Sequence, residues 1–379
     1  MERLAQLESK TLPAGVRSRM IENVNGLHMR ILESGSADNP CVLLLHGFPE
    51  LAFSWRKVML PLAEAGFYVV APDQRGYGMT TGSDNRFEGD VASFRLLNLA
   101  RDTLGLVYAL GLNQVHAVVG HDFGSPVAAI CAVIRPDVFR SVALMSAPFA
   151  GMPVLEPRQT TQSSVSTIDH RSLADLPRPR KHYQWYYSEP EANRDMLDCP
   201  QGLHNFLRSY YHVKSADWNQ NQPYPLDDWS ANSLEQLPTY YVMDADFGMA
   251  ATVAPYMPTD DEVAKCSWLN EEELSVYVCA FQQTEFQGGL NWYRCVTSGD
   301  YLAEMQLFAD VPIVVPSIFI AGANDWGIYQ KPGELEKMQQ TACRDFRGVE
   351  LISGAGHWVQ QEQSVAVVET LLSRLLSLD

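Results

Sequence analysis

The sequence predicts an α/β protein in which helices flank a mostly parallel central sheet, with a mainly helical segment inserted between two parts of that sheet. Short apolar strands alternate with helical segments before residue 150 and again after residue 308, which is typical of a parallel sheet covered on both faces. The chain between these parts lacks that alternation. With 379 residues, of which 46% are hydrophobic, the chain can bury a large core. We therefore expect a first core part at 1–150, a helical cap at 151–307 and a second core part at 308–379.

Local signals predict each element of the first core part. Asn25-Gly26 is typical of a tight type I′ turn and predicts a hairpin over residues 20–33. Leu97, Leu104 and Val107 recur at helical spacing within the helix expected at 94–110. The other expected elements are strands at 41–45, 67–72, 115–119 and 141–145 and helices at 53–66 and 126–134.

The inserted segment and the second core part follow other patterns. Residues 151–182 are polar and rich in Ser, Thr and Pro, which predicts a linker. From 183 to 307 the pattern is helical and aromatic, interrupted by a loop at 216–230. The core is then completed by strands at 311–320 and 349–352 and by a terminal helix with Val365, Val368, Leu372 and Leu375 on one face.

Composition limits the partners that we expect. The formal net charge is −17 and no basic cluster is present, which argues against nucleic acid or anionic membranes. No apolar run approaches the roughly 20 residues of a membrane span, so we expect no membrane span. We expect a cytoplasmic protein whose partner is a small molecule. A homodimer is compatible with the sequence. The seven cysteines are scattered without metal-site spacing, so we expect neither a zinc site nor a disulfide framework.

The stretch Val118-Val119-Gly120-His121-Asp122-Phe123-Gly124 has the pattern of a sharp turn from a strand into a helix. Gly120 and Gly124 flank Asp122 two residues away on either side, where a Cβ would crowd a sharply turned backbone. Such a turn exposes its apex residue at the N-terminus of the helix. Asp122 is therefore a candidate nucleophile, and the alternative is an ordinary turn in which it only caps the helix.

Two further ionisable residues follow predicted strands. Asp325 comes shortly after the strand at 311–320, and His357 comes shortly after the strand at 349–352. The carboxyl edge of a parallel sheet is where ligands bind in open α/β folds. Each residue alone is more typical of a turn or of a structural histidine. Together, in the chain order nucleophile, acid, histidine, the three residues predict a catalytic triad.

An aspartate nucleophile indicates the type of electrophile. Attack on an sp3 carbon by a serine would leave a stable ether, whereas attack by Asp122 leaves an alkyl ester that water can cleave. The aspartate also needs no activating base, since its ordinary pKa is about 3.9. His357, oriented by Asp325, can then act as the base toward water. This chemistry requires neither a metal nor an organic cofactor.

The chain resembles the α/β-hydrolase-fold epoxide hydrolases over nearly its whole length. The resemblance rests on the stretches H-G-F-P-E (46–50), D-Q-R-G-Y-G (73–78), G-H-D-F-G (120–124), G-x-x-D (322–325) and G-H-W-V-Q-Q-E (356–362). It implies an α/β-hydrolase fold with an inserted cap. It also implies oxyanion donors at the backbone N–H groups of Phe48 and Phe123, and a cis peptide bond between Phe48 and Pro49.

The cap contains two stretches that resemble the ring-opening segments of that family. Residues 290–294, L-N-W-Y-R, are similar to the stretch that carries one ring-opening tyrosine, which implies this role for Tyr293. The stretch Tyr183-Gln184-Trp185-Tyr186-Tyr187 resembles the segment that carries the other. The match favours Tyr183, but Tyr187 remains an alternative because the tyrosines of this stretch share one helical face.

The resemblance implies hydrolysis of an apolar epoxide to a vicinal diol through an alkyl ester on Asp122. A haloalkane or haloacid dehalogenase with the same triad is one alternative, although such enzymes usually carry Trp or Arg where this chain has Phe123. A non-catalytic small-molecule-binding protein on the same fold is a second alternative. Residues 214–265 lie outside the catalytic motifs, so the role of this segment and the substrate remain open.

Overall fold

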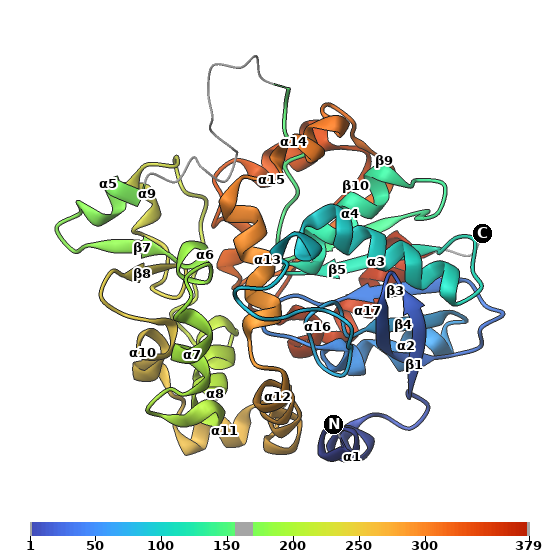
Figure 1. Ribbon diagram of the computed structural model, residues 1–379, viewed down its shortest axis with the longest axis horizontal. Helices are drawn as coiled ribbons and strands as arrows, with labels where there is room; N and C mark the ends of the chain where they lie inside the picture. Colours follow the sequence, from blue (N-terminus) through green and yellow to red (C-terminus); the bar gives the residue numbers. More distant parts are fainter. Residues whose placement is uncertain (1, 156–169, 377–379) are drawn as a thin grey trace.

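One mixed sheet of eight strands forms the centre of the protein, which the computed structural model describes for residues 2–155 and 170–376 (Figure 1). The strand order is β1-β2-β4-β3-β5-β6-β9-β10. The β1–β2 and β2–β4 pairs are antiparallel and the remaining pairs are parallel, which confirms the predicted sheet. Its strands are β1 (Arg17–Val24), β2 (Leu27–Ser34), β3 (Cys41–Leu45), β4 (Tyr68–Pro72), β5 (Ala117–His121), β6 (Val142–Met145), β9 (Ile313–Gly322) and β10 (Cys343–Ile352).

The sheet separates two hydrophobic cores because successive side chains of a strand point to opposite faces. In β3, Val42 and Leu44 belong to one core, whereas Leu43 and Leu45 belong to the other. Helices α2 (Arg56–Glu64) and α17 (Ser364–Arg374) cover the first core, and α3 (Leu96–Ala109) and α4 (Gly124–Ile134) cover the second. The strands are therefore buried on both sides, as their continuous apolar runs predict.

The chain between β6 and β9 is mainly helical and lies to one side of the sheet (Figure 1). It also contains a two-stranded antiparallel sheet, β7 (Arg180–His182) with β8 (Val242–Asp244). Its helices are α5 (His170–Ala174), α6 (Tyr183–Tyr186), α7 (Ala192–Leu197), α8 (Gly202–Lys214), α9 (Ala231–Leu234), α10 (Met249–Val253), η3 (Ala254–Tyr256), α11 (Asp260–Lys265), α12 (Glu271–Thr284), α13 (Gln287–Ser298), α14 (Leu302–Met305) and η4 (Gln306–Phe308). Its helical content fits a cap, and the boundaries at 151 and 307 stay predictions.

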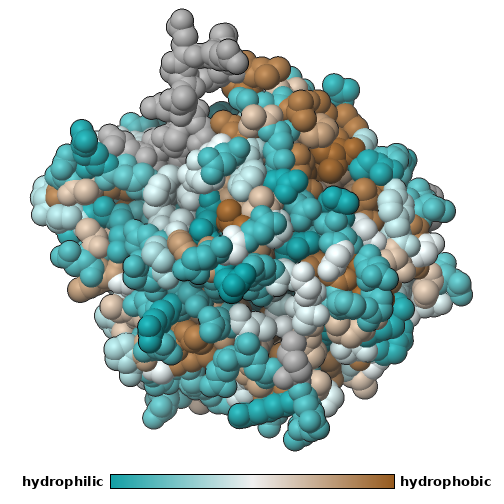
Figure 2. All heavy atoms as spheres, viewed as in Figure 1, coloured by the Kyte–Doolittle hydropathy of each residue, from teal (hydrophilic) through white to brown (hydrophobic). Residues whose placement is uncertain are grey.

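Short helices complete the chain outside this segment. They are η1 (Ala52–Trp55), η2 (Val91–Phe94), η5 (Trp326–Ile328), α15 (Glu334–Lys337), η6 (Met338–Ala342) and α16 (Val359–Glu362). The surface in the same view is mostly hydrophilic, and its apolar colour gathers near α14 and β9 (Figure 2). Within the described ranges, no helix combines the length and the apolar character needed to cross a membrane.

Several elements differ from the sequence-based prediction. Helix α1 (Glu2–Thr11) was not predicted, because it is polar and buries only Leu4 and Glu8. Strand β10 begins at Cys343, whereas the sequence predicted a strand from 349. Its first residues were missed because this is an edge strand and they are largely exposed and polar.

Two further predictions need correction. Val365 is 71% exposed in the first turn of α17, which buries Val367, Val368 and Leu371 instead. The stretch predicted as a linker, 151–182, contains α5 and β7, and its residues 156–169 lie outside the described part of the chain.

Candidate active site

Asp122 occupies the sharp turn between β5 and α4. Its φ is 51°, a left-handed conformation that a non-glycine residue adopts only where the surrounding structure enforces it. A Cβ on Gly120 would lie 2.1 Å from the Gly124 carbonyl oxygen, and one on Gly124 would lie 2.4 Å from the Leu45 carbonyl oxygen. The two glycines are therefore required for the turn, as the sequence indicates. The turn leaves Asp122 8% exposed beyond the end of β5.

The backbone after β3 approaches the Asp122 carboxylate closely. The Phe48 N–H donates to Asp122 Oδ1 at 2.8 Å. A Cβ on Gly47 would lie 2.3 Å from the same oxygen, so only glycine allows this approach. The Phe48–Pro49 peptide bond is cis, as expected. The other expected donor, the Phe123 N–H, makes no hydrogen bond to the carboxylate, so one of the two expected donors contacts Asp122 here.

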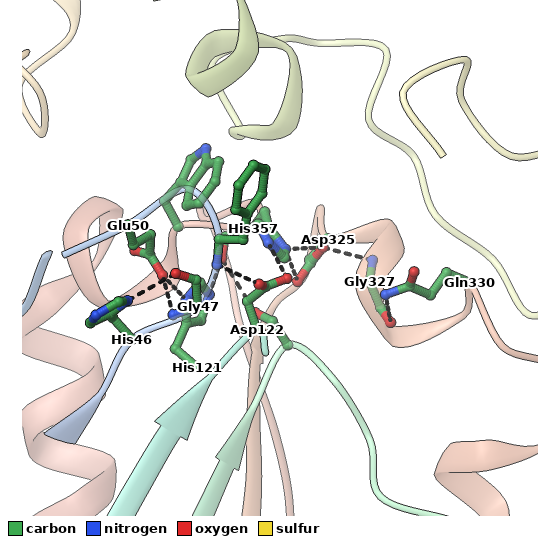
Figure 3. A network of polar contacts seen from close by, with 12 residues as sticks. His46, Gly47, Glu50, His121, Asp122, Asp325, Gly327, Gln330 and His357 are labelled. Carbon is green, nitrogen blue, oxygen red and sulfur yellow. Dashed lines mark hydrogen bonds and ion pairs between the residues drawn. The ribbon is translucent and has the colours of Figure 1, made fainter. Parts of the chain in front are cut away.

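His357 lies between the two carboxylates of the predicted triad (Figure 3). Its Nδ1 is 3.1 Å and 3.2 Å from the two oxygens of Asp325, and the Gly327 N–H donates to Asp325 Oδ1 at 2.7 Å. Because an ionised carboxylate only accepts, Nδ1 carries the proton in a neutral ring and Nε2 is left as the acceptor. Nε2 lies 3.3 Å from Asp122 Oδ2 and has no hydrogen-bond partner among the described residues.

The charges in the site set the protonation of the triad. Burial alone would raise the pKa of Asp122, but His357, Lys214 and His121 together hold that pKa well below its ordinary value. Burial and Lys214 act to lower the pKa of His357, but Asp325 and Asp122 outweigh them and raise it. Asp122 is therefore ionised at neutral pH and available for attack without a base.

Tyr183 and Tyr293 lie together near this carboxylate, with ring centroids 6.0 Å apart. Burial first, and then the charge of Asp122, raise the pKa of both phenols well above the ordinary value, so both keep their protons at neutral pH. The Tyr183 hydroxyl donates to Gln330 Oε1 at 3.1 Å and accepts from Gln184 Nε2 at 3.2 Å. Two protonated phenols outside the triad therefore lie within the electrostatic influence of Asp122.

The other two tyrosines of the 183–187 stretch have different partners. The Tyr187 hydroxyl donates to the Tyr210 hydroxyl at 3.0 Å, and after burial it is Tyr210 that raises its pKa. The Tyr186 hydroxyl donates to Asp195. The hydroxyls of Tyr186 and Tyr187 therefore donate to other residues of the inserted segment, whereas the charge of Asp122 is a leading cause of the raised pKa of Tyr183, which favours Tyr183 over the alternatives.

Three polar side chains that were not predicted as site residues, two of them labelled in Figure 3, lie next to the loop that carries His357, here called the histidine loop. His121 Nδ1 lies 2.6 Å from Glu50 Oε2, and its Nε2 lies 2.7 Å from the His357 carbonyl oxygen. Gln360 Nε2 donates to Glu50 Oε1 at 2.8 Å. All three lie in the stretches quoted above for the family resemblance, so those stretches were the sequence signal that could have identified them. Gln330, the partner of Tyr183, and Lys214 lie outside every quoted motif.

Comparisons with known proteins identify the family of the chain. Residues 40–363 match the family described as alpha/beta hydrolase fold. Epoxide hydrolase A of Mycobacterium tuberculosis is 30% identical over 373 residues, which cover 96% of this chain and 99% of that protein. The epoxide hydrolase of Caballeronia sordidicola is 27% identical over 355 residues, covering 94% and 92%.

Solved structures give the same result. The structure of an epoxide hydrolase from an endophytic Streptomyces is similar with a TM-score of 0.75 and 28% identity, covering 95% of each chain. The sheet, the turn at Asp122 and these similarities agree, and the chain belongs to the α/β-hydrolase-fold family and, within it, to the epoxide hydrolases.

Proposed function

We propose that the protein hydrolyses an epoxide to a vicinal diol through an alkyl ester on Asp122. The observation that carries this proposal is the pair of phenols, Tyr183 and Tyr293, whose rings lie 6.0 Å apart. The Tyr293 ring packs against Phe48, whose N–H donates to Asp122, and against Phe123, the residue after Asp122. An epoxide oxygen leaves as a basic alkoxide and needs such donors, whereas a halide leaves as a stable anion. The similarity to named epoxide hydrolases supports the same activity.

In the first half-reaction, Asp122 Oδ2 attacks one epoxide carbon. The bond between that carbon and the ring oxygen breaks, and the electron pair moves to the oxygen, which takes a proton from Tyr183 or Tyr293. Oδ1 is the less suitable nucleophile because it already accepts from the Phe48 N–H. General acid assistance of this kind is typically worth about 10²–10⁴-fold.

In the second half-reaction, His357 Nε2 takes a proton from water while the water oxygen attacks the Asp122 carboxyl carbon. The carbonyl electron pair moves to Oδ1, which accepts a hydrogen bond from the Phe48 N–H. The second expected donor, the Phe123 N–H, belongs to the residue that follows Asp122 in the chain. Donors of this type are worth about 3 kcal/mol each. The bond from the carboxyl carbon to Oδ2 then breaks, and the diol leaves with the proton from His357. Asp122 is left as a carboxylic acid, and transfer of its proton to the tyrosinate formed in the first half-reaction restores the carboxylate and the phenol.

The walls of the site favour an apolar substrate. Phe48 packs against Tyr293 with ring centroids 5.6 Å apart, and Phe123 packs against the same tyrosine at 5.0 Å. Aromatic side chains therefore surround the tyrosine that would bind the epoxide oxygen. The substrate class that fits this lining is an epoxide with hydrocarbon or aromatic substituents.

A substrate panel tests the proposal. Purified protein is incubated with styrene oxide, aliphatic epoxides, short chloroalkanes and fluoroacetate, and diol and halide are quantified with chiral separation of the diols. We expect diol from at least one epoxide and no halide. Halide release without diol would instead identify a dehalogenase, and a ligand-induced rise in Tm with no turnover would identify a binding protein.

A further inference from the structure

Lys214, the last residue of α8, is a buried lysine whose backbone contacts the loop that carries His357. The residue is 4% exposed, and within residues 2–155 and 170–376 its ammonium makes neither an ion pair nor a hydrogen bond. Four aromatic rings surround it instead. The distances from Nζ to the ring centroids are 5.0 Å for Tyr241, 5.3 Å for Tyr210, 5.5 Å for Trp358 and 5.9 Å for Tyr240.

This aromatic cage, formed by Tyr210, Tyr240, Tyr241 and Trp358, stabilises the charge without neutralising it. A buried cation is costly unless something compensates for its lost hydration, and the negative faces of aromatic rings provide such compensation. A carboxylate partner would cancel the field of the lysine, but rings do not. Since that field acts through a poorly screened interior, the charge of Lys214 remains effective on its neighbours.

The backbone holds Lys214 beside the histidine loop. The His357 N–H donates to the Lys214 carbonyl oxygen at 2.8 Å. A Cβ on Gly356 would lie 2.5 Å from the same oxygen, so a glycine is needed for this contact. The ring of Trp358, which is part of the cage, lies 4.7 Å from the ring of His357. These contacts therefore fix the position of Lys214 relative to His357.

Glu362 strengthens this connection. Its Oε2 accepts from the Ala216 N–H at 2.8 Å and from the Gly356 N–H at 2.9 Å, and its Oε1 accepts from the Trp358 N–H at 3.0 Å. One carboxyl group thus joins the chain after α8 to the loop that carries His357. The segment at 214–216, which the sequence left without a role, is part of the catalytic surroundings.

We infer that Lys214 is a positioning residue for the second half-reaction, in which its caged charge keeps His357 in the neutral, proton-accepting form. This inference rests on the proposed function, because it needs an alkyl ester on Asp122. No proton passes through Lys214. The proton of water moves to His357 Nε2, and the carbonyl electron pair moves to Asp122 Oδ1, as described above.

The charges that face His357 change during the reaction. In the resting protein the titratable groups around His357 are Asp122 from the turn after β5, Asp325 after β9, His121 from β5, Lys214 from α8 and Glu362 from α16, which is hydrogen-bonded to the N–H groups on both sides of His357. Asp122 and Asp325 raise the pKa of His357, and Lys214 lowers it. Alkylation removes the charge of Asp122, while the charge of Lys214 remains. The pKa of His357 therefore falls after alkylation. A larger fraction of His357 is then neutral at the stage where it must accept a proton from water.

The test measures hydrolysis of the alkyl-enzyme as a function of pH. Enzyme in excess is mixed with an epoxide that the wild type converts, alkylation is allowed to finish, and decay of the intermediate is followed by tryptophan fluorescence after a pH jump. Lys214→Met replaces the ammonium group by a neutral side chain of similar length. The acid limb of the hydrolysis rate, which is the pH range where protonation of His357 lowers the rate, should move to higher pH by about one unit or more. Removal of a group that lowers the pKa of His357 must raise that pKa, so more acid-side activity is lost.

Two further variants separate charge from packing. Lys214→Arg keeps the charge and should keep the acid limb close to that of the wild type. Lys181 is the matched control, because its Nζ lies 5.2 Å from the Tyr186 ring and it is not among the groups that shift the pKa of Asp122 or His357. Lys181→Met should leave the acid limb in place.

The outcomes distinguish the inference from the proposed function. If the wild type converts no epoxide, the proposed function fails. If it does, and a folded Lys214→Met has an unchanged acid limb, the inference is wrong. Lys214→Gln is the second neutral variant, and it should shift the limb in the same direction. If both neutral variants fail to fold while Lys214→Arg folds, the lysine is a structural residue and the inference is also overturned.

Discussion

The two sides of the active site are held in place in different ways. On the core side, Asp122 and His357 come shortly after the parallel strands β5 and β10, so the hydrogen-bonded register of the sheet fixes their separation. On the cap side, Tyr183, Tyr293 and Lys214 come from α6, α13 and α8 and are positioned by ring packing. In the proposed mechanism, the core side forms and breaks the bonds to carbon, whereas the cap side supplies protons and charge. Loss of a core group should therefore stop a step, and loss of a cap group should slow it.

The largest effect is expected for the nucleophile on the core side. Asp122→Asn should lower epoxide turnover by about 10⁴-fold or more, since no other group can form the ester. The fold should persist, because asparagine tolerates the left-handed conformation at φ 51°. Steady-state turnover and Tm check this. Alkylation of a different residue in single turnover, detected by peptide mass spectrometry, would contradict the assignment.

The base on the core side should separate the two half-reactions. His357→Gln should still be alkylated at Asp122, because attack by an ionised carboxylate needs no base, and the ester should then accumulate. Steady-state turnover should fall by roughly 10³-fold while a burst of one equivalent remains. Rapid-quench mass spectrometry measures both. If alkylation stops as well, in a folded protein that still binds substrate, the division of roles between Asp122 and His357 is wrong.

The tyrosines test the cap side. Tyr183→Phe and Tyr293→Phe should each slow alkylation about tenfold, from the loss of roughly 1.5 kcal/mol of transition-state hydrogen bonding. The double variant should be slowed far more, because either phenol can partly replace the other, and hydrolysis of the formed ester should change little. Stopped-flow tryptophan fluorescence resolves these rates.

Tyr187→Phe is the matched control for this pair, since the Tyr187 hydroxyl donates to Tyr210. It should leave alkylation close to the wild-type rate. A slow Tyr187→Phe with a silent Tyr183→Phe would reassign the second donor to Tyr187. Unchanged alkylation in the double variant would show that neither Tyr183 nor Tyr293 takes part in ring opening.

The pH dependence should also differ between the half-reactions. The pKa of Asp122 is held well below its ordinary value, and both phenols keep their protons, so alkylation should be nearly independent of pH between neutrality and pH 5.5. Hydrolysis requires neutral His357 and should fall about tenfold per pH unit below the pKa of that residue. Single-turnover rates across this range check both expectations, and a parallel fall of the two rates would refute them.

The same contrast explains how much the sequence could predict. Gly120 and Gly124 are required by the backbone of the turn, and Asp325 and His357 follow apolar strands, so short local patterns were enough to identify the core side. The mostly parallel sheet followed from the alternation of strands and helices. Edge and terminal elements were less well predicted, since β10 and α1 are partly exposed and their polar residues hide the periodicity.

The cap side was only partly predictable from local patterns, because the stretch at 290–294 indicated Tyr293 but the stretch at 183–187 left Tyr187 as an alternative to Tyr183. Tyr183 and Tyr187 lie one helical turn apart, and only their tertiary partners, Gln330 and Tyr210, distinguish them. Lys214 was not predicted, because a lone lysine is ordinarily exposed and three of the four rings around it, those of Tyr240, Tyr241 and Trp358, come from distant parts of the chain. Such clusters depend on packing between segments, which sequence spacing does not reveal.

Isotope labelling tests the central claim, a covalent ester on Asp122, most directly. Enzyme in excess converts an epoxide once in water enriched in oxygen-18, and both the diol and the peptide that contains Asp122 are analysed by mass spectrometry. Because water attacks the carboxyl carbon, the oxygen added to the first diol must come from Asp122. We expect an unlabelled diol and one heavy oxygen in the Asp122 carboxylate. A labelled diol with an unlabelled Asp122 peptide would show direct attack of water on the epoxide and would contradict the account.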